Sequence, residues 1–425
     1  MPQFFFETYG CQMNVADSGT IADLLRLRGY TAALTATDAD LILVNTCSVR
    51  EHAEQRALAR LRELCSKKKR SQSVWVIGCM AERLGTTLIK TIPAIDRVIG
   101  AKAMDTIAEQ LNGLLPAPSV IDCETPIGIT PSNTVSTLVP VMRGCDNYCA
   151  YCIVPYVRGH EHSLPHREII AQIESLCARG VVEITLVGQN VNSYHDRETD
   201  FADLLHHLHA IPALQRIRFV TSHPKDLSDK LIDTMAKLPK LCKHIHLPLQ
   251  AGSTAVLTAM NRRYTAEHYL RQIEKLRSAI PHLDITTDLM VGFPGETTAD
   301  FEQTMALVQQ VKFTMAFMFA YSIRPGTAAA TLADTVSAAE KSSRLNTLVT
   351  TQTAITKEIY AAMVGARGTV LATERQRERE KMWIAHDNGC KRILLQDPNE
   401  IAGRLIPVLF TRSSGMTLIA ERISA

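Results

Sequence analysis

The sequence predicts an α/β protein with an N-terminal doubly wound parallel sheet, a central partial (β/α) barrel and a small C-terminal β-barrel. Three observations predict this fold class. Short apolar runs alternate with helical segments over the first hundred residues, as they do in parallel sheets. The alternation resumes from about residue 138 to residue 321, where six strand–helix repeats indicate a (β/α) barrel. After residue 365 short β-like runs replace the helices, which favours a small barrel.

The domain boundaries follow from these changes of pattern. We expect an N-terminal domain over 1–115, a linker over 116–136, a central barrel over 137–362 and a C-terminal barrel over 363–425. Gly, Pro, Ser and Thr dominate the linker, and no apolar period survives there. In the N-terminal domain we expect strands at 4–6, 41–44 and 74–77 and helices at 18–28 and 51–69.

The remaining elements follow from the same patterns. The six barrel strands are expected at 139–142, 183–188, 216–220, 244–247, 284–291 and 316–321. A long helix is expected at 337–363, and the strands of the tail at 368–372, 381–385, 392–395, 405–410 and 418–420.

Size and composition limit the class of protein. A chain of 425 residues is too long for one hydrophobic core. The net charge of +3 identifies no partner by itself. No apolar run is long enough to span a membrane, and the first residues lack the basic segment of a signal peptide. We therefore expect a cytoplasmic protein, in which eleven cysteines are metal ligands or core residues and not disulfides.

Three cysteines follow the first predicted barrel strand at C-x3-C-x2-C spacing: Cys145, Cys149 and Cys152. A [4Fe–4S] cluster takes four ligands, usually thiolates. Three thiolates leave one iron open, and the amino and carboxylate groups of S-adenosylmethionine can chelate it. The spacing therefore predicts a cluster that cleaves S-adenosylmethionine to a carbon radical.

A structural zinc site is the alternative for these cysteines. Zinc prefers four protein ligands, but no fourth Cys or His follows at short spacing. His160 and His162 lie eight and ten residues beyond Cys152. The cluster is therefore the favoured interpretation.

A second set of cysteines, Cys11, Cys47 and Cys79, follows the three predicted N-terminal strands. The carboxyl ends of parallel strands meet at one edge of a sheet, where ligands bind. Three thiolates at that edge indicate a metal site, and burial as ordinary core residues is the alternative. The remaining cysteines have no partner at ligand spacing and are expected to be core residues: Cys65, Cys123, Cys177, Cys242 and Cys390.

Together with its neighbouring segments, this arrangement of cysteines resembles the radical S-adenosylmethionine methylthiotransferase family over nearly the whole length of the sequence. The segments that carry the resemblance are 7–14, 45–51, 78–83, 144–159, 186–192, 221–224, 246–253 and 288–296. The tail is similar to the small RNA-binding barrel of these enzymes, the TRAM domain. Residues 47–51, followed by Ala53, Glu54 and Gln55, resemble the branch that acts on tRNA.

The resemblance implies two iron–sulfur clusters of [4Fe–4S] type and two uses of S-adenosylmethionine. Cys11, Cys47 and Cys79 would hold an auxiliary cluster that supplies or carries sulfur, in a [4Fe–4S] state or a [3Fe–4S]-like state with an extra sulfide. One S-adenosylmethionine would donate a methyl group. Another would yield the radical that removes hydrogen from carbon 2 of the adenine.

The tRNA branch implies the substrate and the partners. The substrate would be N6-isopentenyladenosine at position 37 of tRNA, presented on the anticodon stem-loop. A flavodoxin or ferredoxin would supply electrons, and we expect a monomer. The alternatives are a ribosomal protein aspartate or threonylcarbamoyl-adenosine as substrate, or a non-enzymatic iron–sulfur or zinc RNA-binding protein.

Several residues at the ends of the predicted barrel strands are candidates to contact S-adenosylmethionine, since sites of (β/α) barrels lie there. They are Tyr151, Gln189, Ser222, His223, Gln250, Gly292, Glu296 and Arg324. Tyr151 is a candidate for the adenine ring and Gln189 for the methionine end. For Tyr151, Gln189 and Arg324 an ordinary rim or surface position is the alternative.

The RNA contacts are less clear from the sequence. His162 and Leu164 stand where the family often has arginine, so any phosphate contact there is weaker, moved or dependent on histidine protonation. Basic residues gather at 67–70 and in the C-terminal barrel, at Arg375, Arg377, Arg379, Lys381, Lys391 and Arg392. Either group is a candidate to hold phosphates. Glutamates interleave with the second group, so a solvated face is the alternative.

Overall fold

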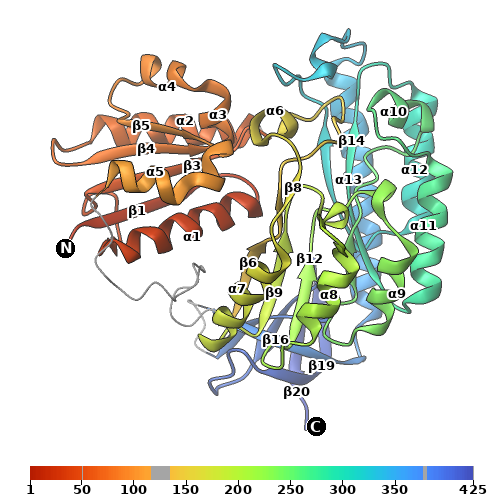
Figure 1. Cartoon of the computed structure of the whole chain (residues 1–425). Coiled ribbons are helices and arrows are strands. Elements are labelled where there is room, and N and C mark those ends of the chain that lie inside the picture. Colours follow the sequence, from red (N-terminus) through yellow and green to blue (C-terminus); the bar gives the residue numbers. More distant parts are fainter. Residues whose placement is uncertain (50, 116–134, 377–380, 425) are drawn as a thin grey trace.

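The computed structural model describes residues 1–49, 51–115, 135–376 and 381–424 (Figure 1). Almost all of the linker expected over 116–136 lies outside the described residues, as do Cys123, Arg377 and Arg379. Within the described residues no helix is long and apolar enough to cross a membrane.

The N-terminal domain is a five-stranded parallel sheet with the order β2-β1-β3-β4-β5. Its strands are β1 (Gln3–Thr8), β2 (Thr31–Ala32), β3 (Leu41–Thr46), β4 (Ser73–Gly78) and β5 (Arg97–Gly100). Its helices are α1 (Gln12–Leu27), α2 (Glu51–Ser66), α3 (Cys79–Leu84), α4 (Thr86–Thr91) and α5 (Ile107–Leu114), with a 3-10 turn, η1 (Ala101–Thr106). α1 and α5 pack on one face of the sheet, and α2, α3 and α4 pack on the other. The doubly wound sheet predicted from the sequence is confirmed.

The central domain is a partial barrel of six parallel strands. The triplets β12-β9-β6 and β13-β14-β15 are joined through a bridge between Ile217 and Leu241. The strands are β6 (Ser136–Pro140), β9 (Glu183–Val187), β12 (Arg216–Phe219), β13 (His244–His246), β14 (Asp284–Val291) and β15 (Met315–Ala320). Each overlaps the strand expected from the sequence.

Helices cover the outside of this barrel (Figure 1). They are α7 (His166–Ala178), α8 (Phe201–His209), α9 (Asp229–Lys237), α10 (Thr254–Ala259), α11 (Ala266–Ala279), α12 (Thr298–Val311) and α13 (Ala338–Ala362). Helix α6 (Val154–Arg158) lies at the junction with the N-terminal domain. Short strands β7 (Met142–Arg143), β8 (His162–Ser163), β10 (His195–Asp196) and β11 (Thr199–Asp200) and turns η2 (Val191–Ser193), η3 (Pro224–Asp226) and η4 (Ala328–Thr331) lie in the connections.

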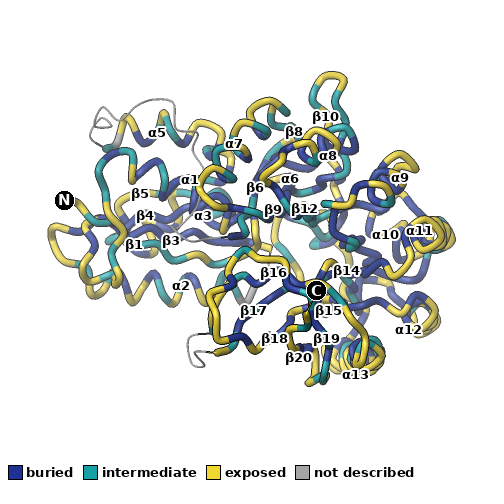
Figure 2. Tube along the Cα trace, turned by 90° about the horizontal axis from the view of Figure 1, so that it is seen from below, coloured by how far each residue is buried: buried dark blue, intermediate teal, exposed yellow. Residues whose placement is uncertain are grey.

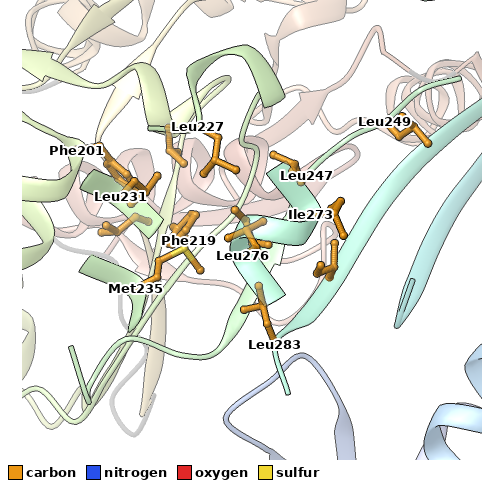
Figure 3. Close-up of a cluster of buried hydrophobic side chains, with 14 of the residues drawn as sticks. Phe201, Phe219, Leu227, Leu231, Met235, Leu247, Leu249, Ile273, Leu276 and Leu283 are labelled. Carbon is orange, nitrogen blue, oxygen red and sulfur yellow. The ribbon is translucent and has the colours of Figure 1, made fainter. Parts of the chain in front are cut away.

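The main core lies between the strands and the outer helices. Figure 3 shows part of it, where Phe219 of β12 meets Leu231 and Met235 of α9. Alternation along β14 explains the arrangement, because Ile285 and Leu289 face this core while Thr286 and Asp288 face the barrel interior. Figure 2 shows the exposed outer surfaces of α11, α12 and α13 around the buried strands.

The C-terminal domain is a closed barrel with the order β16-β17-β18-β20-β19. Its strands are β16 (Arg367–Arg375), β17 (Met382–His386), β18 (Arg392–Gln396), β19 (Leu405–Ser414) and β20 (Thr417–Arg422). It lies against the lower end of the central barrel (Figure 1), where Arg216 Nη1 donates to the His386 carbonyl oxygen at 2.8 Å. Lys391 is buried in an ion pair with Asp284. The expectation that Lys391 belongs to an exposed basic group is therefore wrong.

Candidate active site between two cysteine sets

Cys145, Cys149 and Cys152, called the radical set here, lie on the loop between β7 and α6. Gly144 makes the tight turn that opens the loop. Its φ is +74°, and a Cβ there would lie 1.9 Å from the carbonyl oxygen of His160. Only glycine fits this approach of two backbones. The loop is closed on itself by a hydrogen bond from the Cys145 N–H to the Gly159 carbonyl oxygen, at 3.2 Å.

Cys145 and Cys149 of the radical set are buried, whereas Cys152 is partly exposed, and two of the three sulfurs receive polar contacts. Burial raises the pKa of Cys145, and it raises the pKa of Cys152 to about 12. Both sulfurs are therefore protonated at neutral pH until a metal displaces the proton. Asn147 Nδ2 donates to Cys145 Sγ at 3.4 Å, and Arg262 Nη1 donates to Cys149 Sγ at 3.2 Å. Arg262 was not predicted from the sequence, because it lies 113 residues from Cys149.

Cys11, Cys47 and Cys79, called the auxiliary set here, lie at the carboxyl edge of the N-terminal sheet. Cys11 caps α1, Cys47 follows β3 and Cys79 begins α3. The residue before Cys11, Gly10, lies close to Cys47. A Cβ at position 10 would lie 2.7 Å from Cys47 Cβ, so only glycine fits there. The pKa of Cys79 is raised to about 12, mainly by burial and in smaller part by the neighbouring Cys47 and Cys11. The three thiols therefore lie within electrostatic reach of one another.

Buried amides hold this edge of the sheet. Asn14 Nδ2 donates to Asn45 Oδ1 at 2.8 Å and to the Thr46 carbonyl oxygen at 3.1 Å. Cys11 Sγ lies 3.2 Å from Asn14 Oδ1. The sequence signal for these amides is their position beside Cys11 and Cys47. This network explains why α1 begins at Gln12 and not at residue 18, where the apolar period starts.

Helix α6 connects the two cysteine sets. It begins two residues after Cys152 and packs on α3, which Cys79 begins (Figure 1). Arg158 at its end donates to Asp17 Oδ2 at 3.0 Å, and Arg143 Nη1 donates to Asp17 Oδ1 at 2.6 Å. Burial alone would lower the pKa of Arg158, but Cys79 and Asp17 raise it above its ordinary value. This buried ion network fixes the N-terminal domain on the central barrel.

Four of the candidate cofactor contacts present buried polar atoms without a partner among the described residues. They are Gln189 Oε1, Ser222 Oγ, His223 Nε2 and Glu296 Oε1. Burial lowers the pKa of His223 to about 2, so its ring is neutral. His223 Nδ1 accepts from the Lys225 N–H at 3.2 Å, which leaves Nε2 as a donor. Buried polar groups are rarely unpaired, and these atoms suit a ligand with amino, carboxylate or hydroxyl groups.

The other candidate contacts have different surroundings. The Tyr151 hydroxyl lies 3.5 Å from Arg262 Nη1. Gln250 has a φ of +70°, and its backbone forms hydrogen bonds with β14. Gly292, with a φ of +71°, approaches Lys341. Glu296 forms an ion pair with Arg344 at 2.9 Å, and its Oε1 is buried without a partner among the described residues.

Two cavities lie in and beside the central barrel. One, of about 520 Å³, runs through the barrel interior from Gln12, the neighbour of Cys11, past Thr185 and His244 to the C-terminal barrel. The other, of about 300 Å³, lies between the N-terminal and central domains and is lined by Ser48 and Arg324 among others. The structure thus places Arg324 at a domain interface.

The expected RNA contacts are mostly engaged within the protein. His162 faces Asp105 at 3.3 Å, and Leu164 packs against the main core. In the run at 67–70, Lys67 pairs with Glu63 and Lys68 pairs with Asp96. In the C-terminal barrel Arg375 pairs with Glu400 at 3.2 Å and stacks on Trp383.

The donors of both cysteine sets are thiols, which are the usual protein ligands of an iron–sulfur cluster. In the described part of the chain no three Cys, His, Asp or Glu side chains are close enough to share one metal ion. Thiolates of a cluster bind different irons and lie farther apart than the ligands of one ion. Residues Gln189, Ser222 and His223 fit S-adenosylmethionine through their unpaired polar atoms.

Comparisons with known proteins agree with this fold and site. Residues 139–308 match the Radical SAM superfamily, and residues 3–100 match the Uncharacterized protein family UPF0004. The fold resembles a radical S-adenosylmethionine methyltransferase, TsrM, from Kitasatospora setae (TM-score 0.60, 14% identity, 78% of this chain and 75% of the other). The protein is therefore a radical S-adenosylmethionine enzyme, a class that uses a [4Fe–4S] cluster and S-adenosylmethionine.

Full-length relatives define the family. The chain is 44% identical to the tRNA-2-methylthio-N(6)-dimethylallyladenosine synthase of Geobacter metallireducens, over 98% of this chain and 97% of the relative. It is 40% identical to the synthase of the same name from Dictyoglomus thermophilum, over 100% and 99%. The chain belongs to the family of tRNA-2-methylthio-N(6)-dimethylallyladenosine synthases.

Proposed function

We propose that this protein inserts sulfur and a methyl group at carbon 2 of N6-isopentenyladenosine at position 37 of tRNA. The single observation that carries the proposal is the arrangement of two cysteine sets on either side of α6, in a chain of this family. One site that generates a radical and one that stores sulfur must reach the same carbon atom. A short helix between them supports such an arrangement, since five residues span only about 7.5 Å.

Each cysteine set has one role in this proposal. The radical set holds a [4Fe–4S] cluster, and the auxiliary set holds a second one, in a [4Fe–4S] state or a [3Fe–4S]-like state with extra sulfide. When bound, these groups and S-adenosylmethionine supply hydrogen abstraction, sulfur transfer and methyl transfer. The surrounding chain keeps water away from the site, because it buries Cys47, Cys79, Cys145 and Cys149.

The remaining residues bind and orient the cofactor and the substrate. Gln189, Ser222 and neutral His223 hydrogen-bond S-adenosylmethionine through their unpaired atoms. Tyr151, Gln250, Gly292 and Glu296 complete its surroundings, and Arg324 extends them to the domain interface. The cavity between the N-terminal and central domains receives the adenine, because Ser48, the neighbour of Cys47, and Ile153, the neighbour of Cys152, both line it.

The domains and partners complete the proposal. The N-terminal domain (1–115) carries the auxiliary set, the linker (116–136) joins it to the barrel (137–362), and the C-terminal barrel (363–425) contacts the anticodon stem-loop. A flavodoxin or ferredoxin supplies electrons to a monomeric enzyme. Support for the tRNA partner comes from the names of the full-length relatives.

The test uses reconstituted protein with isopentenylated tRNA, dithionite and S-adenosylmethionine. We expect the methylthio nucleoside by mass spectrometry, together with iron and sulfide for two clusters. Matched controls are tRNA without the isopentenyl group, tRNA with threonylcarbamoyl-adenosine, and a ribosomal protein. No product with isopentenylated tRNA, or product only with another substrate, contradicts the proposal.

A further inference from the structure

Arg262 is a buried cation that touches the radical set. Its side chain is 4% exposed, and its Nη1 donates to Cys149 Sγ at 3.2 Å. It lies on the turn between α10 and α11, far from the cysteine loop in sequence. Neither the cysteine spacing nor the cofactor contacts above require an arginine at this place.

Several hydrogen bonds fix the guanidinium. Nη2 donates to the Pro248 carbonyl oxygen at 3.1 Å, and Nε donates to the Tyr264 hydroxyl at 3.1 Å. The Tyr264 hydroxyl in turn donates to the Leu249 carbonyl oxygen at 2.8 Å. With its other nitrogens held in this way, Arg262 presents Nη1 to Cys149 in one orientation.

The charge of Arg262 has no carboxylate to balance it. Among the ion pairs of the described residues none includes Arg262. A buried cation is costly unless a negative group compensates it. The thiolates of a cluster at the radical set are the negative group that this position offers.

A positive charge in contact with a cluster sulfur also acts on electron transfer. Reduction adds one negative charge to the cluster, so a fixed cation nearby stabilises the reduced state more than the oxidised state. Hydrogen bonds to cluster sulfurs are among the features that set the reduction potential. A guanidinium holds both a fixed charge and a directed donor, which lysine cannot reproduce in full.

We propose that Arg262 is a positioning residue that orients the Cys149 sulfur and raises the reduction potential of the cluster held by the radical set. The inference rests on the proposed function, because it takes the radical set as cluster ligands. Its consequence is that a biological electron donor of moderate potential is able to reduce the cluster.

The test measures the potential and not the turnover. In a background variant with Cys11→Ala, Cys47→Ala and Cys79→Ala, only the radical-set cluster contributes to the electron paramagnetic resonance signal of reduced protein. Redox titrations then compare this background with added Arg262→Gln and with Arg271→Gln, an exposed arginine of α11. We expect Arg262→Gln to lower the ratio of reduced to oxidised cluster about tenfold at a fixed potential, equivalent to about 59 mV for one electron. Arg271→Gln leaves the ratio unchanged.

A second variant, Arg262→Lys, provides a test in case Arg262→Gln does not retain its cluster. Arg262→Lys keeps the charge and loses the planar fork, so its potential should lie between those of the background and Arg262→Gln. An unchanged potential in whichever variant retains iron overturns the proposal. Loss of iron from both variants also overturns it, since the guanidinium would then only hold the fold. Absence of a reduced-cluster signal in the background variant itself contradicts the proposed function instead.

Discussion

Replacing Asp17 by asparagine removes the carboxylate that Arg143 and Arg158 share. Asp17 is 1% exposed, and the two arginines are 8% and 6% exposed. Asparagine has one accepting oxygen in place of two and carries no charge, so Arg158 loses its counter-ion. Arg143 keeps a contact with Asp105 at 3.2 Å, and that carboxylate is 43% exposed.

The expected magnitude follows from burial. Removing one partner of a buried ion pair costs about 3–5 kcal/mol, because a charge is left without compensation. Asp105 offsets part of the loss at Arg143, so we expect the lower end, about 3 kcal/mol. The loss should fall on the N-terminal domain, since α1 carries Asp17 and contacts β6 of the barrel.

Tryptophan fluorescence measures this change. The chain has two tryptophans, Trp75 in β4 and Trp383 in the C-terminal barrel. In a Trp383→Phe background, urea unfolding of the apo-protein followed by Trp75 reports the N-terminal domain alone. The control is Glu63→Gln, which breaks surface pairs with Lys67 and Arg60 and should leave the midpoint almost unchanged. A loss for Asp17→Asn below about 1 kcal/mol would refute the reasoning.

Three further predictions concern the cysteine sets and the cofactor contacts. Cys47→Ala should retain cleavage of S-adenosylmethionine and lose sulfur insertion, as measured by 5′-deoxyadenosine release and nucleoside mass spectrometry. Gly144→Ala should lose about half of the iron, one cluster of two, because its Cβ would collide with the backbone of His160. Gly180→Ala is its control, since Gly180 shares a positive φ (+97°) but has no atom near the added carbon. His223 has a pKa of about 2 when folded and about 6.5 when unfolded, so the unfolded state binds more protons between these values. Stability is therefore lost as the pH falls below 6.5, and between pH 7.0 and 5.5 wild type should lose about 1 kcal/mol more than His223→Asn in urea unfolding followed by circular dichroism.

Each of these predictions has a contrary result. Loss of both activities in Cys47→Ala would mean that the auxiliary set only holds the fold. Equal iron in Gly144→Ala and wild type, or equal iron loss in Gly180→Ala, would contradict the steric argument. Parallel pH profiles for His223→Asn and wild type would show that His223 is protonated in the folded protein.

Local patterns in the sequence determined the fold class and both cysteine sets. Strands and helices follow from the spacing of apolar residues, which depends on near neighbours in the chain. The radical set follows from a spacing of eight residues, from Cys145 to Cys152. The auxiliary set was predicted across long separations only because parallel strand ends meet at one edge of a sheet. The start of α1 was predicted six residues too late, because Asn14 and Asp17 bury polar groups that break its apolar pattern.

The tertiary structure alone decided which distant charged residues meet. Arg262 contacts Cys149 across 113 residues, and Asp17 joins Arg158 across 141. Lys391, expected on the surface, is buried against Asp284. Such contacts leave no period in the sequence, because a charged side chain finds its partner through the packing of whole domains. The positions of the cysteines predict where the clusters bind, whereas the packed barrel and the N-terminal domain decide which cations surround these cysteines.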